Sequence, residues 1–226
     1  LRQLARSAAA SAARASEARP ALFRPQVAYR LRRSQNTDTP LPPEFPAGQN
    51  PPDGAMIDYY LPADATGPVT LEIVVDRGAG GAAERIVRRY SSDDRPEPVD
   101  EKSVDVPLYW IRPPRVLPAS AGMHRFVWDL RYPAPDAFQH DYPISAIYGD
   151  TPREPLGVLA TPGAYAVRLT VGGRTLTAPL TLKMDPRASI TPLGLQQQFA
   201  LGAKIVDLMR RSYAAKLTDL NDTVAT

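Results

Sequence analysis

Few side chains in this sequence could transfer a proton or bind a metal. It has two histidines and no cysteine, and it contains no GxSxG, P-loop, HExxH or dinucleotide-binding motif. His140 stands near Asp136 and Asp141, and imidazole nitrogen with carboxylate oxygen is a ligand set that several metals accept. That stretch reads as an irregular loop, however, and His124 falls on the apolar face of a strand. We therefore interpret His124 as a packed or edge histidine and expect no catalytic residue, cofactor or metal in this chain.

Two carboxylates on predicted strands are the candidates for glycoside hydrolysis, which uses a pair of carboxyl groups flanking the scissile bond. Asp58 and Asp129 both alternate with apolar residues, so both should point outward. Arginines such as Arg125 and Arg131 are expected beside them. We therefore interpret both as outward-facing residues near arginines, and we expect no hydrolysis by this chain itself.

Aromatic residues suggest another hypothesis, a carbohydrate-binding module, because sugar rings stack on flat aromatic faces while polar groups bond their hydroxyls. The alternative is that these rings cover the edges of a β domain with their hydroxyl groups in water. The residues available for carbohydrate contacts are Tyr60, Tyr109, Trp110, Tyr142 and Tyr148.

The clearest strand in the chain is Gly122-Met-His-Arg-Phe-Val-Trp-Asp-Leu-Arg131, which carries one of only two tryptophans. Side chains alternate between the two faces of a strand. This alternation predicts a core face made of His124, Phe126, Trp128 and Leu130.

Further alternating runs predict strands that pack around this one. Residues 55–61 follow strong turn chemistry at Asn50-Pro-Pro-Asp-Gly54. The run 69–75 places Val69, Leu71, Ile73 and Val75 inward, and 84–90 is its hairpin partner. A Gly-Gly pair joins 163–171 to 174–184, as the primed turns of hairpins prefer. Together these runs predict a mainly β fold, an immunoglobulin-like antiparallel β-sandwich over residues 54–185.

Residues 1–53 are predicted to form an extended, proline-rich N-terminal arm or linker. Its first 19 residues, rich in Ala and Arg, fit a solvated tail that is helical only in part, or a short helix. Alternation of Val27, Tyr29 and Leu31 suits one edge strand. A second irregular stretch, residues 132–156, has the length of a binding loop or partner contact.

Residues 186–226 are predicted to form a C-terminal segment with an amphipathic helix that begins at Thr191-Pro192. Its apolar residues recur at alternating spacings of four and three, a stripe that must be covered. We expect association with the rest of a parent protein or between copies. The alternative is docking on the outer face of the sandwich at Val74 and Val87. The stripe consists of Leu195, Phe199, Gly202, Val206, Met209 and Tyr213.

Composition narrows the function classes. The net charge of +3 is mild and the arginines are scattered, which disfavours nucleic-acid binding. No apolar run approaches the roughly 20 residues that span a bilayer, and no signal peptide is visible. The sequence begins with Leu1, and we expect it to be part of a longer protein.

The order of motifs resembles that in the C-terminal region of large bacterial exported proteins with sialidase-like or sortilin-like β-propellers, often called glycosyl hydrolases. The resemblance runs from about Leu22 to Met209. It rests on the 50–61 run, a Val-Thr-Leu-Glu-Ile strand, the 122–131 strand and Pro162-Gly-Ala-Tyr-Ala-Val-Arg-Leu-Thr-Val-Gly-Gly173. The centre is also similar to the immunoglobulin-like domain of the flagellar hook-capping protein, in Trp128-Asp129 and in Pro162 to Tyr165.

This resemblance implies that the first residues are the tail leaving a propeller and that any active site lies upstream, because no Asp-box of the Ser-x-Asp-x-Gly-x-Thr-Trp kind occurs here. It implies a non-catalytic accessory or structural domain of an exported protein, extracellular or periplasmic. The alternatives are a carbohydrate-binding module that assists a glycoside hydrolase, and a part of a glycosyl hydrolase. The implied partners are the upstream β-propeller, a second copy through the C-terminal helix, and carbohydrate.

Overall fold

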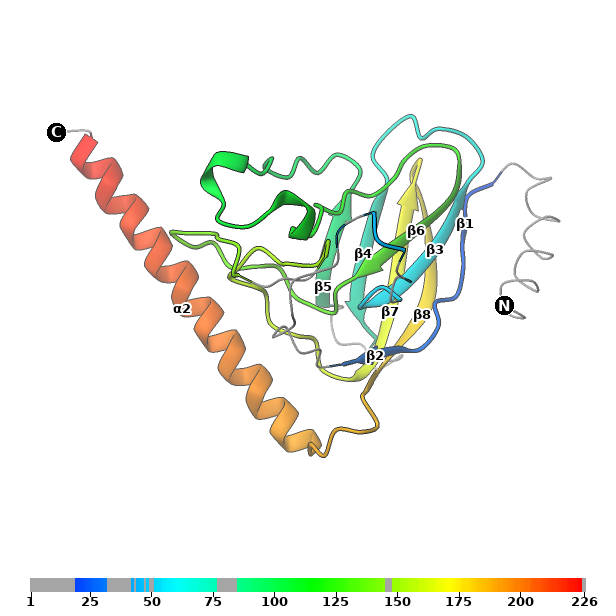
Figure 1. Ribbon diagram of the computed structural model, residues 1–226. Coiled ribbons are helices and arrows are strands. Elements are labelled where there is room, and N and C mark those ends of the chain that lie inside the picture. Colours follow the sequence, from blue (N-terminus) through cyan, green and yellow to red (C-terminus); the bar gives the residue numbers. More distant parts are fainter. Residues whose placement is uncertain are drawn as a thin grey trace.

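The computed structural model describes residues 19–31, 51–76, 85–144 and 148–224, together with 42, 44–46 and 48, and describes side chains as far as residue 218. Two β-sheets surround one core, and a long C-terminal helix lies beside them (Figure 1). The mainly β fold with a C-terminal helix is as predicted. The partial helix predicted for the first 19 residues falls almost wholly outside the described residues.

The smaller sheet has three antiparallel strands in the order β1-β3-β6: β1 (Ala21–Leu22), β3 (Ala55–Leu61) and β6 (Gly122–Trp128). The larger sheet has five strands in the order β2-β8-β7-β4-β5. These are β2 (Ala28–Arg30), β8 (Arg174–Met184), β7 (Gly163–Val171), β4 (Thr70–Val75) and β5 (Arg85–Ser91). Only the pair β2–β8 is parallel among the described strand pairs. The arm of residues 19–31 thus gives one strand to each sheet.

The core lies between the two sheets and centres on Trp128, which is fully buried. Its ring meets Tyr165 of the other sheet edge-on, with centroids 5.7 Å apart, and its Nε1 donates to the Arg131 carbonyl at 3.0 Å. Phe126 is buried as the alternation predicts. The predicted strand was too long, because β6 ends at Trp128, and Leu130, although buried, lies beyond it with a positive φ of 59°. His124, at the far end of the same face, is only partly buried.

The β7–β8 hairpin was predicted in full. Val171 pairs with Arg174 across a two-residue turn, and both turn glycines have positive φ, 54° at Gly172 and 77° at Gly173. Two consecutive left-handed residues give the type I′ turn, whose twist matches that of the strands.

Two other details of the strand predictions were wrong. In β4, Val74 is buried and Val75 only partly so, where the pairing with β5 shifts register after Ile73. In β2 the inward residues are Ala28 and Arg30, while Val27 and Tyr29 are each 43% exposed. Alternation fixed the period of β2 but not which face is buried.

The buried Arg30 joins three parts of the chain. Its Nη1 donates to the Ala160 carbonyl at 3.3 Å and its Nη2 donates to Gln198 Oε1 at 2.5 Å. Burial lowers the pKa of Arg30, and the nearby Arg131 lowers it further. These bonds explain how a strand can turn a charged residue inward, because a buried charge is tolerated only when its hydrogen bonds are satisfied.

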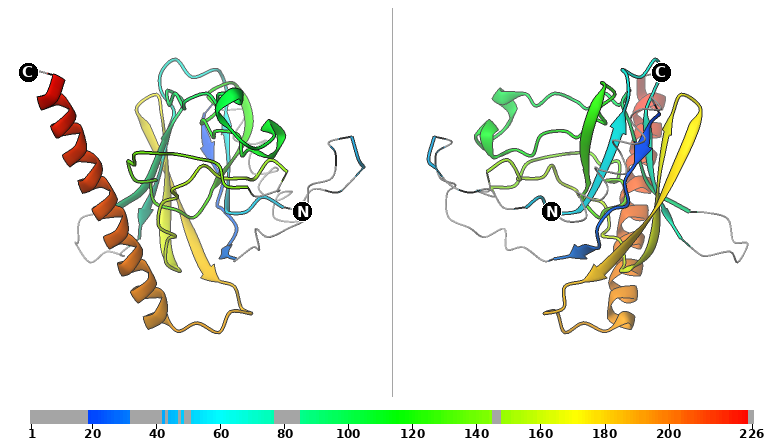
Figure 2. Two further views of the ribbon diagram at one scale, coloured as in Figure 1. Left: turned by 60° about the vertical axis from the view of Figure 1, so that its left-hand side comes forward. Right: turned by 90° about the vertical axis from the view of Figure 1, so that its right-hand side faces the viewer.

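The C-terminal helix, α2 (Pro192–Val224), packs on residues 132–158 and runs along one side of the molecule (Figure 2). The Phe199 ring lies 5.3 Å from the Tyr132 ring, and Tyr213 lies 5.5 Å from Phe138. A Cβ on Gly202 would stand only 3.1 Å from a Val158 methyl carbon, so at Gly202 the helix backbone comes close to the Val158 side chain.

The predicted apolar stripe is therefore the face of α2 that is covered, but it is covered by the described residues of segment 132–158 of the same chain, which we call the insertion. This corrects both earlier expectations for the stripe. It is not left free for a partner, and the contacts that hold the helix fall on Tyr132, Phe138 and Val158 instead of Val74 and Val87. Among the described residues, no helix combines the length and the apolar character needed to cross a membrane.

Candidate functional site

Three of the five aromatic residues proposed for carbohydrate contacts lie together. The Tyr109 ring is 6.2 Å from the rings of both Trp110 and Tyr148. Trp110 ends the short 3₁₀ helix η2 (Leu108–Trp110), and Tyr148 begins a turn of the insertion. Tyr109 and Tyr148 are 41% and 51% exposed. We call this group the aromatic cluster.

Backbone hydrogen bonds hold the two segments of the aromatic cluster side by side. The Gly149 N–H donates to the Tyr109 carbonyl and the Thr151 N–H donates to the Trp110 carbonyl, each at 2.9 Å. Ile111 and Thr151 then form a parallel bridge. No local sequence pattern indicated this pairing, because it joins residues about 40 positions apart.

The other two proposed residues lie elsewhere. Tyr60 is on β3, opposite Met123 of β6 and Ala21 of β1. Tyr142 belongs to the insertion and lines a groove rich in arginine. The structure therefore divides the proposed carbohydrate contacts among three places.

The candidate catalytic groups each have a local partner. Asp58 receives two hydrogen bonds from the Arg125 guanidinium, at 2.7 and 2.9 Å, and this hydrogen bonding raises the pKa of Arg125. Asp129 accepts a 3.2 Å bond from the backbone N–H of Arg131. His124 Nε2 lies 2.6 Å from the Ser120 carbonyl oxygen, and its ring is 5.1 Å from that of Tyr59. The Asp58–Arg125 pair and the edge position of His124 agree with the sequence analysis, whereas Asp129, expected to face outward, is only partly exposed and accepts from a backbone N–H.

Across the described part of the chain, no three His, Cys, Asp or Glu side chains come together as metal ligands. Asp141, one of the residues considered for a metal, instead accepts a 2.7 Å bond from the backbone N–H of Tyr142. The backbone of Asp141 also pairs with Glu154, through bonds of 3.0 and 2.7 Å. Asp141 therefore helps to hold the two limbs of the insertion together.

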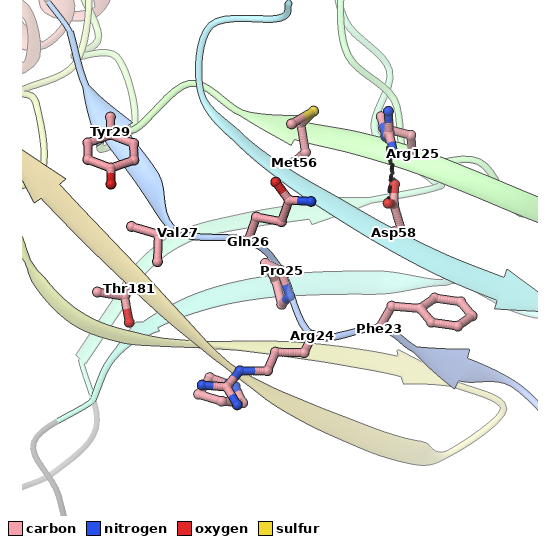
Figure 3. A pocket seen from close by; sticks show the side chains of 11 residues that line it. Phe23, Arg24, Pro25, Gln26, Val27, Tyr29, Met56, Asp58, Arg125 and Thr181 are labelled. Atoms are coloured by element: carbon pink, nitrogen blue, oxygen red, sulfur yellow. Dashed lines mark hydrogen bonds and ion pairs between the residues drawn. The ribbon is translucent and has the colours of Figure 1, made fainter. Parts of the chain in front are cut away.

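One groove, of about 630 Å³, lies beneath the arm where it crosses from β1 to β2 (Figure 3). Phe23, Pro25 and Val27 line it from the arm, and Asp58 and Arg125 line it from the smaller sheet. Those two charges are joined to each other, as the dashed lines in Figure 3 show. Arg24 also lines the groove, so its three charged side chains leave an excess of one positive charge.

A second groove, of about 550 Å³, lies between the end of β5, the segment 112–115 and the insertion. We call it the arginine groove, because seven arginines line it beside three carboxylates. Sequence reasoning missed this site, since the arginines are scattered from residue 88 to residue 153 and only the fold brings them together.

Comparison with protein families, curated proteins and solved structures finds no significant match to this chain. Its function must therefore be inferred from the geometry of the aromatic cluster, the arginine groove and α2.

Proposed function

We propose that this chain is a non-catalytic accessory domain of a larger exported β-propeller protein, and that its two sheets form an immunoglobulin-like sandwich. Its function in this proposal is association, and the surface that carries it is the outer face of α2. The motif order from Leu22 to Met209 supports the placement beside a propeller. The apolar character of the exposed helix face supports the association.

The outer face of α2 carries four large apolar side chains that meet solvent. Leu193, Leu201, Ile205 and Leu208 are 63%, 61%, 49% and 49% exposed. The last three follow one another at spacings of four and three, which aligns them on one side of a helix. The stripe from Leu195 to Tyr213 lies against the insertion, so α2 has a second apolar face that nothing in the described chain covers.

The occupant proposed for this face is α2 of a second copy, in antiparallel orientation. A twofold axis between Lys204 and Ile205 would place Leu201 opposite Leu208 of the other copy. Lys204 and Asp207 lie on the same flank of the apolar face, and antiparallel pairing brings like flanks together. Lys204 would then lie about two residues, or about 3 Å of helix rise, from the Asp207 of the other copy. Within one chain Asp207 lies 4.0 Å from Arg211, an exposed pair of little strength, so Asp207 can pair with Lys204 of a second copy. This charge complementarity favours a second copy over an unrelated partner.

Such a contact would be weak. Four apolar side chains per copy are far fewer than the roughly 20–30 residues per side of a stable protein interface. We therefore expect a dimer whose population depends on concentration.

Light scattering across a concentration series tests the proposal. The mass should rise from the 24.6 kDa of one chain toward twice that value, and Leu201→Asp with Ile205→Asp should keep the protein monomeric without changing its melting temperature. Phe199→Asp, on the covered stripe, is the matched control and should lower the melting temperature instead. A wild-type chain that stays monomeric up to about 1 mM, the weak limit of specific association, would refute the proposal.

Carbohydrate binding at the aromatic cluster is the second candidate, because Tyr109, Trp110 and Tyr148 gather at one exposed place. Neutral oligosaccharides should quench or shift the fluorescence of Trp110, and Tyr148→Ala should remove the effect. Tyr60→Ala, on the other sheet, is the matched control. An unchanged spectrum across a panel of neutral oligosaccharides would exclude this candidate.

A further inference from the structure

The arginine groove concentrates positive charge that the fold does not use for ion pairing within it. Seven arginines and three carboxylates line it, and Asp150, outside the lining, pairs with one of these arginines, which leaves an excess of three positive charges in a space of about 550 Å³. The whole chain has a net charge of only +3. The groove is therefore far more basic than the rest of the molecule.

Only two of these arginines have a carboxylate partner among the ion pairs that the structure describes. Arg112 Nε donates to Asp150 at 2.8 Å, and Arg153 Nη1 donates to Glu97 at 2.9 Å. The side chains of Arg112 and Asp150 are about three-quarters buried, whereas the Arg153 pair is open to solvent. An exposed ion pair is worth at most about 1 kcal/mol, so Arg153 remains available to a ligand.

Three further arginines donate to neutral carbonyl groups, which orient the guanidinium without neutralising it. Arg95 donates to the carbonyls of Ser92 and Asp94 at 3.3 and 3.1 Å. Arg115 donates to the Val127 carbonyl at 2.7 Å, and Arg131 donates to the Gly157 carbonyl at 2.8 Å. Each bond uses one N–H of a group that has five, so donors remain for another acceptor.

Arg88 has a buried hydrogen-bond donor that lacks an acceptor. Its guanidinium lies over the Tyr90 ring, 5.1 Å from the centroid, and its Nε is buried without a hydrogen-bond partner. A buried donor that lacks an acceptor costs about 1–3 kcal/mol. The guanidinium also hydrogen-bonds Tyr90, and because Arg88 lines the groove, an oxygen ligand there would accept from its remaining donors.

The electrostatics of Arg131 point the same way. Burial lowers the pKa of Arg131, and the neighbouring Arg112 guanidinium lowers it further, against the opposing effects of Asp129, Asp53 and Glu154. Arg131 and Arg112 thus repel each other in a partly desolvated place, and nearby carboxylates offset part of that repulsion. A bound anion would relieve this repulsion, because opposite charge within a few ångströms stabilises a buried cation.

We propose that the arginine groove binds a small, multiply charged oxyanion that carries carboxylate or phosphate groups. Guanidinium groups form paired, parallel hydrogen bonds to both of these groups, which makes arginine the preferred residue for such ligands. Pro113, Pro114 and Pro152 form rigid walls, and Tyr142 adds an aromatic face from the insertion. The volume lies within the roughly 300–1,000 Å³ usual for small-molecule sites. This site is separate from the α2 face and does not depend on dimerisation.

Calorimetric titration of the whole chain with citrate and with pyrophosphate tests this site, with glucose as the neutral control. Saturable binding of either anion supports the proposal, and the tighter of the two identifies the ligand as carboxylate or phosphate. Binding should weaken steeply as salt is raised, because screening acts on the charges of the groove. Glucose should not bind at this site.

Variants locate the binding in the groove. Arg95→Gln should lower the affinity for the anion about tenfold, the usual effect of losing one charge-assisted hydrogen bond. Arg95 is exposed and hydrogen-bonds only to neighbouring carbonyls, so the Arg95→Gln variant should keep the melting temperature of the wild type. Arg88→Gln should act similarly, and Arg174→Gln, in the exposed β7–β8 turn, is the matched control. The proposal fails if neither anion binds, or if Arg174→Gln weakens binding as much as Arg95→Gln does.

Discussion

Replacing Trp128 by alanine is the sharpest test of the core. Trp128 is the only tryptophan inside the core cluster of buried residues, and its indole bridges the two sheets through Tyr165. Its Nε1 also fixes the turn after β6 by donating to the Arg131 carbonyl. The substitution therefore removes packing between sheets and a hydrogen bond within one turn.

The expected magnitude follows from these two losses. A fully buried large-to-small change costs about 3–5 kcal/mol, and the lost hydrogen bond adds about 1 kcal/mol. At roughly 2–4 °C per kcal/mol for a chain of this size, the melting temperature should fall by about 10–20 °C. A smaller fall would mean that neighbouring side chains collapse into the space that the indole leaves.

Denaturant unfolding followed by far-ultraviolet circular dichroism measures this cost. Trp110→Ala is the matched control, because Trp110 is partly exposed and its buried Nε1 has no hydrogen-bond partner. Trp110→Phe leaves Trp128 as the single tryptophan, whose emission should be blue-shifted in the folded chain. If Trp128→Ala cost no more than Trp110→Ala, the two-sheet core described here would be refuted.

Two further predictions concern the same core. Gly54→Ala should destabilise the fold by at least about 1–3 kcal/mol, because Gly54 has φ 135° and a Cβ there would lie 2.1 Å from the Trp128 carbonyl oxygen. Gly67 stands in open space, so Gly67→Ala should change thermal stability little. Equal melting temperatures for the two variants would contradict the close approach at Gly54. Burial raises the pKa of Tyr59 and Tyr90 above the ordinary value near 10. Above pH 10 these tyrosines ionise in the unfolded chain but not in the folded chain. The free energy of unfolding should therefore be constant below pH 10 and fall above it by about 1.4 kcal/mol per pH unit for each tyrosine. Unfolding titrations from pH 9 to 11 should show this fall, and Tyr59→Phe should make it shallower; a flat profile would argue against the burial.

The strands could be predicted from the sequence because burial on a strand leaves a local trace. Ile57, Leu71 and Val167 stand two residues from their neighbours on the same face, and all are buried as the period requires. The Gly-Gly turn and the helix start at Thr191-Pro192 were equally local, since turn and cap chemistry depends on a few adjacent residues. The period failed only where something nonlocal intervened, as at the register shift after Ile73 and at the inward Arg30.

The candidate sites could not be predicted in this way. Tyr109 and Tyr148 meet because a parallel bridge joins Ile111 to Thr151, and no adjacent residues encode that pairing. The arginine groove collects side chains from β5, from the segment after η2 and from the insertion. Electrostatic repulsion among them exists only once the chain is folded, so composition alone, with its mild net charge, gave no sign of it.

By itself, the sequence determined the β-rich class of this protein, its principal hairpin, its central tryptophan and the amphipathic helix at its end, because each depends on periodicity or turn chemistry over a few residues. Only the tertiary structure decided that the stripe on α2 packs against the insertion, that a second apolar face remains exposed, and that scattered arginines share one groove. Those features depend on which distant segments lie together, and this is determined by the apolar surface that the whole chain removes from water on folding.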